Sequence, residues 1–191
     1  MAKATRSTYR VSFRRRREGR TTYSKRLAMI KSGEARLVAR KTSSSIIAQV
    51  VSYSPKGDNV VASARSAELE KYGLPPIKSL PAAYLVGYAL AKRALSKGVK
   101  RAILDMGRRT PVASSFAFAV LKGALDAGLD VPHNPSVFNE DRFSGKHIAD
   151  YAKSLKESDE AAYKKRFSAY LAKGVSPESL PQLVQSIKSK L

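Results

Sequence analysis

The feature that most limits what this chain can fold into is a run of four arginines, Arg14 to Arg17. Residues 1–26 contain ten Lys and Arg but a single acid, Glu18, so this segment alone has a net charge of +9. Like charges at this density repel one another and leave too little apolar surface for a core, which predicts an extended, solvated arm that becomes ordered on a partner. We expect that partner to be a polyanion, because guanidinium groups match phosphate oxygens and displace condensed counterions.

The positive charge continues beyond the arm. The 191 residues carry 36 Lys and Arg against 15 acids, a net charge of +21, of which residues 27–153 contribute +9 and residues 154–191 only +3. We therefore expect the C-terminal stretch to pack on protein more than on phosphates. The hydrophobic fraction of 43 % is ordinary for a globular domain, and the length allows one core with extensions.

The absence of cysteine and of long apolar stretches limits the kinds of binding site and the cellular location that we expect for this chain. The chain has no cysteine, which excludes disulfides and thiolate metal sites and fits a reducing cytosol. Charged residues interrupt every apolar stretch well before the roughly 18 residues that a membrane span needs, and the N-terminus lacks the apolar block of a secretion signal. We expect a cytoplasmic protein with no membrane partner.

Three short β-branched runs predict strands at residues 36–40, 46–53 and 60–64. Turn-forming residues separate them, and connections this short predict an antiparallel meander. Because side chains alternate along a strand, Ile47, Gln49 and Val51 should share one face of the second strand, and Ile46, Ala48 and Val50 the other. We expect the face that carries Gln49 to be partly exposed.

The apolar period then changes from two to about 3.6. A helix is predicted to begin near Pro81 and end before Gly98, followed by a strand at residues 99–105 and a second helix at about 115–128. The order βββαβα predicts an α/β (α+β) fold with a mixed sheet, in which helices cover one face and leave the other open for binding.

The chain is expected to have three parts. Thr22 can cap a short helix that stops at Gly33, so residues 1–33 form the basic arm and its anchoring helix. Residues 34–132 form the α/β core. Beyond it, residues 146–173 and 177–190 have a modest apolar periodicity typical of polar helices, so residues 133–191 are predicted to be a helical extension and not a second core.

Catalytic groups are scarce. The histidines are His133 and His147, and the acids show no recognised spacing. His147 and Asp150 could pair on a helix, but a surface hydrogen bond or a phosphate contact is the favoured interpretation. The glycines match neither a P-loop nor a dinucleotide motif. We therefore predict a protein that is not an enzyme and has no cofactor, metal or small-molecule substrate.

Two features have more than one interpretation. Arg108 and Arg109 precede a helix start, where a phosphate contact and a solvated pair are equally consistent with the sequence. The aromatic residues Tyr9, Phe13 and Tyr23 lie among arginines, which suits either core packing of the anchoring helix or stacking on unpaired bases.

Several short stretches, spread over roughly residues 9–153, share the pattern of one protein family. They are residues 9–19 (Tyr-Arg-Val-Ser-Phe-Arg-Arg-Arg-Arg-Glu-Gly), 54–58, 63–69, 71–73, 81–85, 102–105, 122–128, 131–133 and 145–151. In these stretches the chain resembles the large-subunit ribosomal protein L18 in its archaeal form, a 5S-rRNA-binding protein of the central protuberance. The resemblance implies that the sheet face and loops bind 5S rRNA, that the arm penetrates rRNA, and that the C-terminal extension contacts 23S rRNA and neighbouring large-subunit ribosomal proteins.

The resemblance also points to individual rRNA-binding residues. In the arm they are Arg10, Arg14, Arg15, Arg16, Arg17, Arg20, Tyr23, Lys25 and Arg26. Around the first sheet turn they are Arg40, Lys41, Ser43, Ser44 and Gln49, with Lys56 and Arg65 as additions. Arg108 and Arg109 complete the set, although their loop departs from the family pattern, because Val112-Ala-Ser-Ser115 stands where a glycine with basic neighbours is expected.

Two other classes of protein remain as alternatives. A non-ribosomal architectural protein that binds duplex DNA would also be small, basic and free of cysteine. The chain lacks a helix-turn-helix or minor-groove wedge pattern, and its arm aromatics suit unpaired bases, so RNA is favoured. An enzyme that acts on RNA would need an acid/base or metal constellation that the sequence does not contain.

Overall fold

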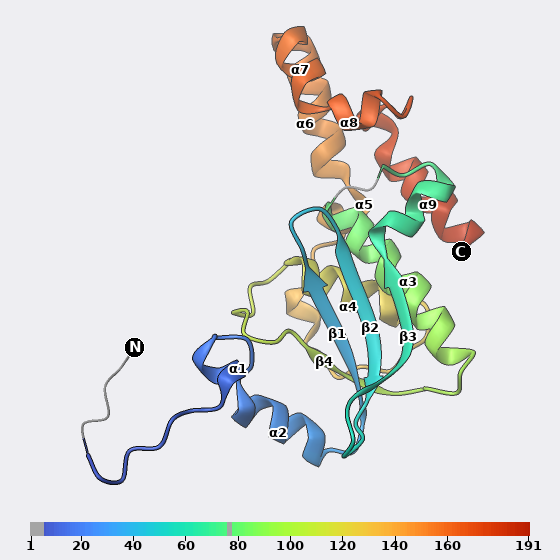
Figure 1. Ribbon diagram of the computed structural model, residues 1–191. Coiled ribbons are helices and arrows are strands. Elements are labelled where there is room, and N and C mark those ends of the chain that lie inside the picture. The colour runs from blue at the N-terminus through green and yellow to red at the C-terminus, as the bar shows by residue number, and fades with distance from the viewer. Residues whose placement is uncertain (1–5, 76–77) are drawn as a thin grey trace.

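The computed structural model describes residues 6–75 and 78–191; the first five residues of the predicted arm lie outside this range. A four-stranded sheet lies at its centre (Figure 1). The strands are β1 (Ala35–Lys41), β2 (Ile46–Ser52), β3 (Asn59–Arg65) and β4 (Ala102–Asp105), in the spatial order β3-β2-β1-β4. The predicted antiparallel meander is confirmed, and so is the mixed sheet, because β4 pairs in parallel with β1.

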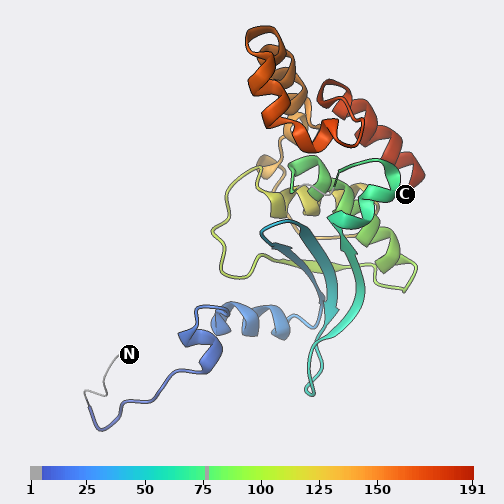
Figure 2. The ribbon, with the colours of Figure 1, turned by 45° about the horizontal axis from the view of Figure 1, so that its top comes forward.

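Two helices cover one face of the sheet, as predicted (Figures 1 and 2). They are α3 (Leu80–Leu95), which begins after the N-cap Ser79, and α4 (Phe116–Asp126). The Ser79 hydroxyl accepts a hydrogen bond from the Ala82 backbone N–H at 3.3 Å, which satisfies one of the free donors of the first turn. Between this layer and the sheet lie the fully buried side chains Leu37, Ala39, Ile46, Ala48, Val50, Leu85, Val86 and Leu90.

The N-terminal arm differs from the extended segment that the sequence predicts. Arg14–Arg17 forms one helical turn, α1, in which the N–H groups of Arg16 and Arg17 donate to the carbonyl of Phe13. Glu18 stabilises this turn because its carboxylate accepts a hydrogen bond from Arg14 at 2.7 Å, and it also forms an ion pair with Arg20 at 3.0 Å. A single acid at the end of the run thus relieves enough repulsion for a turn to form. The arm continues into α2 (Tyr23–Lys31), which ends before Gly33 as predicted.

The C-terminal part is helical and packs against the core. Its elements are η2 (Pro135–Val137), α5 (Glu140–Ser144), α6 (Lys146–Ser158), α7 (Glu160–Arg166), α8 (Ser168–Leu171), η3 (Pro177–Ser179) and α9 (Leu180–Lys190), while η1 (Ser66–Tyr72) follows β3. The predicted helix at 146–173 is therefore divided into three. Helix α9 lies beside α3 and buries Leu180, Val184 and Ile187 in the same hydrophobic cluster as the strands. Among the helices of the described residues, none is both long and apolar enough to cross a lipid bilayer.

Candidate nucleic-acid interface

The sheet face turned away from α3 and α4 carries three rows of side chains. The strand register aligns Arg40 with Ile47 and Arg65, Val38 with Gln49 and Ser63, and Arg36 with Val51 and Val60. Directly opposed residues of neighbouring strands project to the same face. The predicted faces of β2 are confirmed, since Gln49 is partly exposed here while Ala48 and Val50 are buried on the other side.

A buried arginine organises this face. Arg36 is only 4 % exposed, and its two Nη atoms donate to Asp58 Oδ2 at 2.6 Å and to Asp105 Oδ2 at 3.0 Å. Arg26 of α2 reaches the same Asp58 carboxylate at 2.9 and 3.0 Å. Buried charges are stable only when they are paired in this way. The network connects α2, the β2–β3 turn, β1 and the end of β4.

Asp105 holds a second arginine at this surface. Arg40 donates to Asp105 Oδ1 at 3.1 Å, to the Asp105 carbonyl at 2.6 Å and to the Ala39 carbonyl at 2.9 Å. Asp105 Oδ1 also accepts a hydrogen bond from the Gly107 backbone N–H, at 2.7 Å. The guanidinium of Arg40 is thus fixed in orientation, yet 42 % of its side chain remains exposed. The sequence reasoning found Arg40 but missed Arg36, Asp58 and Asp105.

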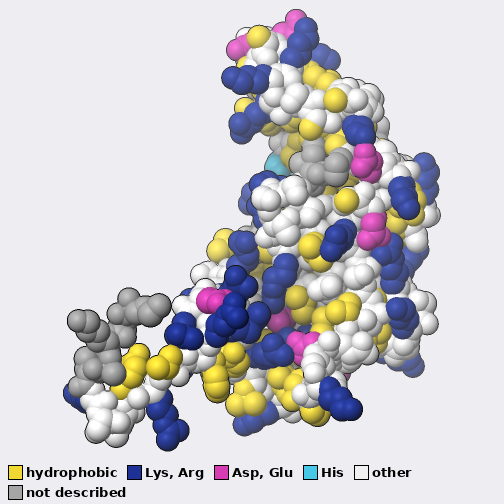
Figure 3. Space-filling model, in the orientation of Figure 1, with side chains coloured by type: hydrophobic (Ala, Val, Ile, Leu, Met, Phe, Trp, Pro, Cys, Tyr) yellow, Lys and Arg dark blue, Asp and Glu magenta, His cyan; other side chains and the backbone are white. Residues whose placement is uncertain are grey.

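The arm and the open face enclose a cavity of about 260 Å³. Six of the residues predicted to bind rRNA, from α1 through β2, line this cavity. Figure 3 shows Lys and Arg side chains gathered where the arm joins the sheet. The cavity is lined by Arg15, Arg20, Thr21, Thr22, Lys25, Arg26, Met29, Arg36, Val38, Arg40, Gln49, Val51, Asp58, Val60, Asp105 and Gly107. Segments far apart in the sequence therefore form one basic, concave surface.

Other predicted residues lie outside this cavity. Lys41, Ser43 and Ser44 lie at the opposite end of β2 from Asp58, in and before the β1–β2 turn, where the Ser43 carbonyl accepts a hydrogen bond from Lys78 at 2.6 Å. Lys56 is exposed in the β2–β3 turn, and Arg65 is exposed at the far end of the open face. The remaining arm residues, Arg10, Arg14, Arg16 and Arg17, are exposed on the arm itself.

The three arm aromatics lie at the protein surface. Tyr9, Phe13 and Tyr23 are 43 %, 73 % and 37 % exposed, so none of them packs in the core. Phe13 and Tyr23 lie against each other with ring centroids 5.3 Å apart. This contact packs the arm against α2, and stacking on unpaired bases stays a prediction for these exposed rings.

Arg108 and Arg109 make contacts within the protein. An Nη atom of Arg108 donates a hydrogen bond to the Gly19 carbonyl, which ties the arm to the β4–α4 loop. The Arg109 guanidinium lies over the ring of Phe116, 5.1 Å from its centroid. Both residues are exposed, so a phosphate contact and a solvated surface position stay open for them.

One comparison with known proteins bears on this surface. The sequence model of the family described as "Ribosomal large subunit proteins 60S L5, and 50S L18" matches residues 7–100, about half of the chain. The chain belongs to this family. The match begins in the arm and continues through the three-stranded meander and α3, so it includes every predicted rRNA-binding residue except Arg108 and Arg109.

Membership in this L5/L18 family gives the chain a structural role in the large ribosomal subunit, with rRNA and ribosomal proteins as its partners. The resemblance found in the sequence is confirmed. The alternative of a non-ribosomal DNA-binding protein is not supported, and the family is one of structural proteins and not of enzymes.

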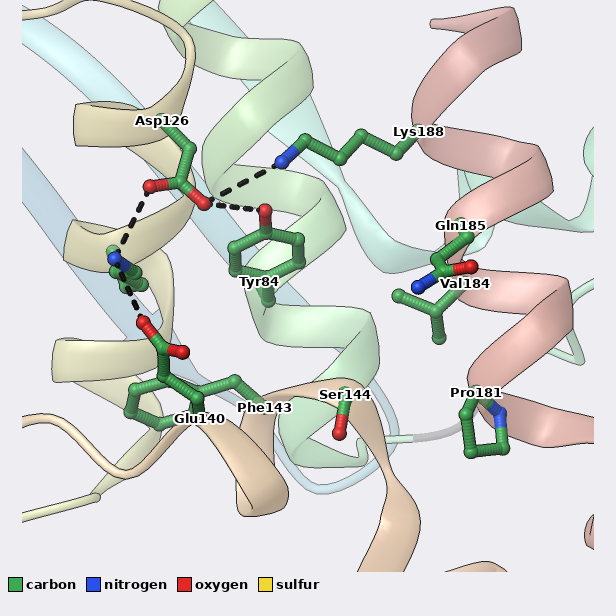
Figure 4. A pocket seen from close by; sticks show the side chains of 10 residues that line it. Tyr84, Asp126, Glu140, Phe143, Ser144, Pro181, Val184, Gln185 and Lys188 are labelled. Carbon is green, nitrogen blue, oxygen red and sulfur yellow. Dashed lines mark hydrogen bonds and ion pairs between the residues drawn. The ribbon is translucent and has the colours of Figure 1, made fainter.

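A second cavity of this ribosomal protein, about 220 Å³, lies between α3, α4, α5 and α9 (Figure 4). Its charged groups pair with one another: Asp126 accepts from the Tyr84 hydroxyl at 2.6 Å, and Lys122 lies 3.3 Å from both Asp126 and Glu140. Burial and the bond to Asp126 raise the pKa of Tyr84 above its ordinary value of 10.0. These pairs link α3, α4 and α5.

The two histidines have different surroundings. His133 Nδ1 lies 2.8 Å from the Val131 carbonyl, and His147 is exposed on α6. Within residues 6–75 and 78–191, no hydrogen bond joins His147 to Asp150, and no cluster of three potential metal ligands occurs.

Proposed function

We propose that this chain binds 5S rRNA and attaches it to 23S rRNA in the central protuberance of a cytoplasmic, archaeal-type large ribosomal subunit. The family supplies the ribosomal role, and the resemblance of the quoted stretches to L18 points to 5S rRNA. The observation that carries the proposal is the meeting of the basic arm and the open sheet face around one cavity. A single folded RNA can contact both surfaces at once.

In this proposal the three parts of the chain bind different partners. Residues 1–33 and the open face of the core, 34–132, neutralise phosphates through the predicted residues of the arm, β1 and β2. The extension, 133–191, faces 23S rRNA and neighbouring proteins. Its small net charge supports this division, since a surface that packs mainly on protein needs few unpaired cations.

The proposal is tested by equilibrium binding of the full chain to labelled 5S rRNA between 50 and 200 mM salt, with duplex DNA of equal length as competitor. We expect 5S rRNA to be preferred and its affinity to fall steeply with salt. For six to ten phosphate contacts the fall is about 10³–10⁵-fold by the duplex calibration, and less for single strands. Equal affinity for the duplex, or an affinity independent of salt, would contradict the proposal.

A further inference from the structure

We propose that the cavity between the arm and the open sheet face holds one unpaired RNA base, while the phosphates on either side of that base lie on the arm cations. The inference rests on the proposed function of this surface and names the group that it recognises. Four features support it: an apolar part of the cavity wall, the fixed guanidinium of Arg40, the position of two carboxylates, and the polar groups of the cavity.

One part of the cavity wall is apolar and suits the face of a flat ring. Val38 and Val51 are almost completely buried on the sheet face, Val60 beside them is about half exposed, and Met29 of α2 faces them from the arm. The volume of about 260 Å³ leaves room for a single small ring system. An apolar wall gives no favourable contact to a phosphate, which has only polar oxygens on its surface.

Arg40 provides a rigid surface for stacking. Three hydrogen bonds fix its guanidinium, and a Cβ built at Gly107 would lie 3.2 Å from its Cζ, so the glycine backbone lies close against it. The remaining exposed surface belongs to a planar cation that is already ordered. Unpaired bases stack on arginine planes of this kind, and an ordered plane loses little entropy on binding.

The two carboxylates disfavour a phosphate inside the cavity. Asp58 and Asp105 balance two of the three charges of Arg26, Arg36 and Arg40. Like charges repel an incoming phosphate, whereas a carboxylate can accept an N–H from a base edge. Arg15 and Lys25, which also line the cavity, are exposed and have no acidic partner among the described residues. The charge pattern therefore separates the base inside from the phosphates outside.

The polar groups of the cavity are both donors and acceptors. Gln49 lies in the middle row of the sheet face and has an amide that can both donate to and accept from a base edge. Arg36 lines the cavity, and its Nε is buried without a hydrogen-bond partner among the described residues. A base edge offers acceptors and donors together, whereas a phosphate offers acceptors alone.

The first test follows side-chain N–H resonances of the full ¹⁵N-labelled chain in low salt. The probes are a short single-stranded RNA, an abasic ribose-phosphate oligomer of the same length, and inorganic phosphate. We expect the RNA to shift the Gln49 amide and the Nε–H signals of Arg36 and Arg40, and the abasic oligomer to shift mainly the arm. Equal shifts with the abasic oligomer or with phosphate would show a phosphate site and overturn the inference, as would shifts confined to the arm.

The second test uses Gln49→Leu, with Gln185→Leu on α9 as a matched control remote from the cavity. Loss of base hydrogen bonds should lower the affinity for the single-stranded RNA about tenfold. The slope of affinity against salt should stay the same, because no phosphate contact is removed. An unchanged affinity, or a loss that comes with a smaller salt slope, would contradict a base site. Circular dichroism of both variants verifies that they are folded.

The outcome separates this inference from the proposed function. If the RNA oligomer shifts Gln49 but the chain does not prefer 5S rRNA over duplex DNA, the base site stands and the assignment to 5S rRNA fails. If 5S rRNA is preferred and neither test implicates Gln49, the assignment stands and the base site fails.

Discussion

A Cβ placed at Gly123 of α4 would lie 2.0 Å from the carbonyl oxygen of Tyr84 on α3, closer than any side chain approaches a backbone. The same relation holds in reverse at Gly87, where a Cβ would lie 2.0 Å from the Val120 carbonyl. The two helices therefore pack backbone to backbone, and the position of this layer under the sheet depends on both glycines.

Gly123→Ala is expected to destabilise the folded state by about 1–3 kcal/mol. Alanine gains about 1 kcal/mol of helix propensity over glycine, but the forced separation of α3 and α4 costs more. Urea unfolding followed by circular dichroism measures the difference. Ser154→Ala, at an exposed position of α6, is the control and should change stability by less than about 0.5 kcal/mol. A Gly123→Ala variant as stable as the parent would show that the helices can move apart without loss.

Arg36→Met is expected to destabilise the protein strongly, because it leaves two carboxylates without their buried partner. Removal of one member of a buried pair costs about 3–5 kcal/mol. We expect the lower end of this range, since Asp58 keeps Arg26 and Asp105 keeps Arg40. Chemical unfolding of the purified variant gives the value.

Two companion variants of Arg36→Met make the result specific. Adding Asp105→Asn to Arg36→Met should recover part of the loss, because it removes the buried charge that Arg36 no longer neutralises. Glu160→Gln breaks an exposed pair with Lys164 on α7 and should have no measurable effect. If Arg36→Met unfolds at the same denaturant concentration as the parent, the network has no role in stability.

Local patterns were enough to predict the meander and its faces. The alternation from Ile46 to Ser52 and the turn residues on either side depend only on neighbours in the sequence, and the structure has the same strands and faces. The role of Arg36 depends on partners 22 and 69 residues away. In the sequence, Arg36 looks like Arg40, an ordinary charged residue at the end of a short strand, so its burial could not be inferred.

Two other features that depend on long-range packing could not be predicted from the sequence. A parallel pair was expected, but a local pattern does not reveal that β4 pairs with β1, across the sheet from β3. Across α7, α8 and the residue between them, the buried rings of Tyr163, Phe167 and Tyr170 are spaced by three or four residues. Charged residues between these rings lower the mean hydropathy and conceal how much of the segment is buried.

Replacing Arg14 to Arg17 together by Ala is expected to weaken RNA binding strongly and to leave thermal unfolding of the free protein almost unchanged. None of these side chains is buried. The slope of log affinity against log salt should fall by roughly 0.7–0.9 for each phosphate contact that is lost. Filter binding and a thermal melt measure the two quantities. A much lower melting temperature would mean that the arm is part of the packed body.

Leu90→Ala should have the opposite effect. This side chain of α3 is completely buried between the helices and the sheet, so its truncation leaves a cavity and costs about 2–5 kcal/mol. RNA affinity should fall only in proportion to the unfolded fraction. A binding titration at about 10 °C below the onset of melting, where the variant is folded, tests this. Loss of affinity in the fully folded variant would show that the core shapes the binding surface.

Tyr84→Phe should lower stability by an amount that depends on pH. Burial alone would raise the pKa of Asp126, but the hydrogen bond from Tyr84 and the charges of Lys122 and Lys188 outweigh it and hold this pKa below its ordinary value of 3.8. A carboxylate whose pKa is lowered by folding stabilises the protein above its unfolded pKa, and this contribution disappears as the pH falls through the folded value. Removal of the hydroxyl should therefore cost about 1–3 kcal/mol near neutral pH.

The difference in unfolding free energy between the parent and Tyr84→Phe should be constant above pH 3.8 and shrink as the pH is lowered further. Urea unfolding at a series of pH values measures it. Tyr88→Phe is the control on the same helix: its ring stays beside Lys92 and Lys188, and any difference from the parent should not vary over this pH range. A Tyr84→Phe difference that stays constant in acid would mean that the hydroxyl does not stabilise the charged form of Asp126, and that the lysines alone keep its pKa low.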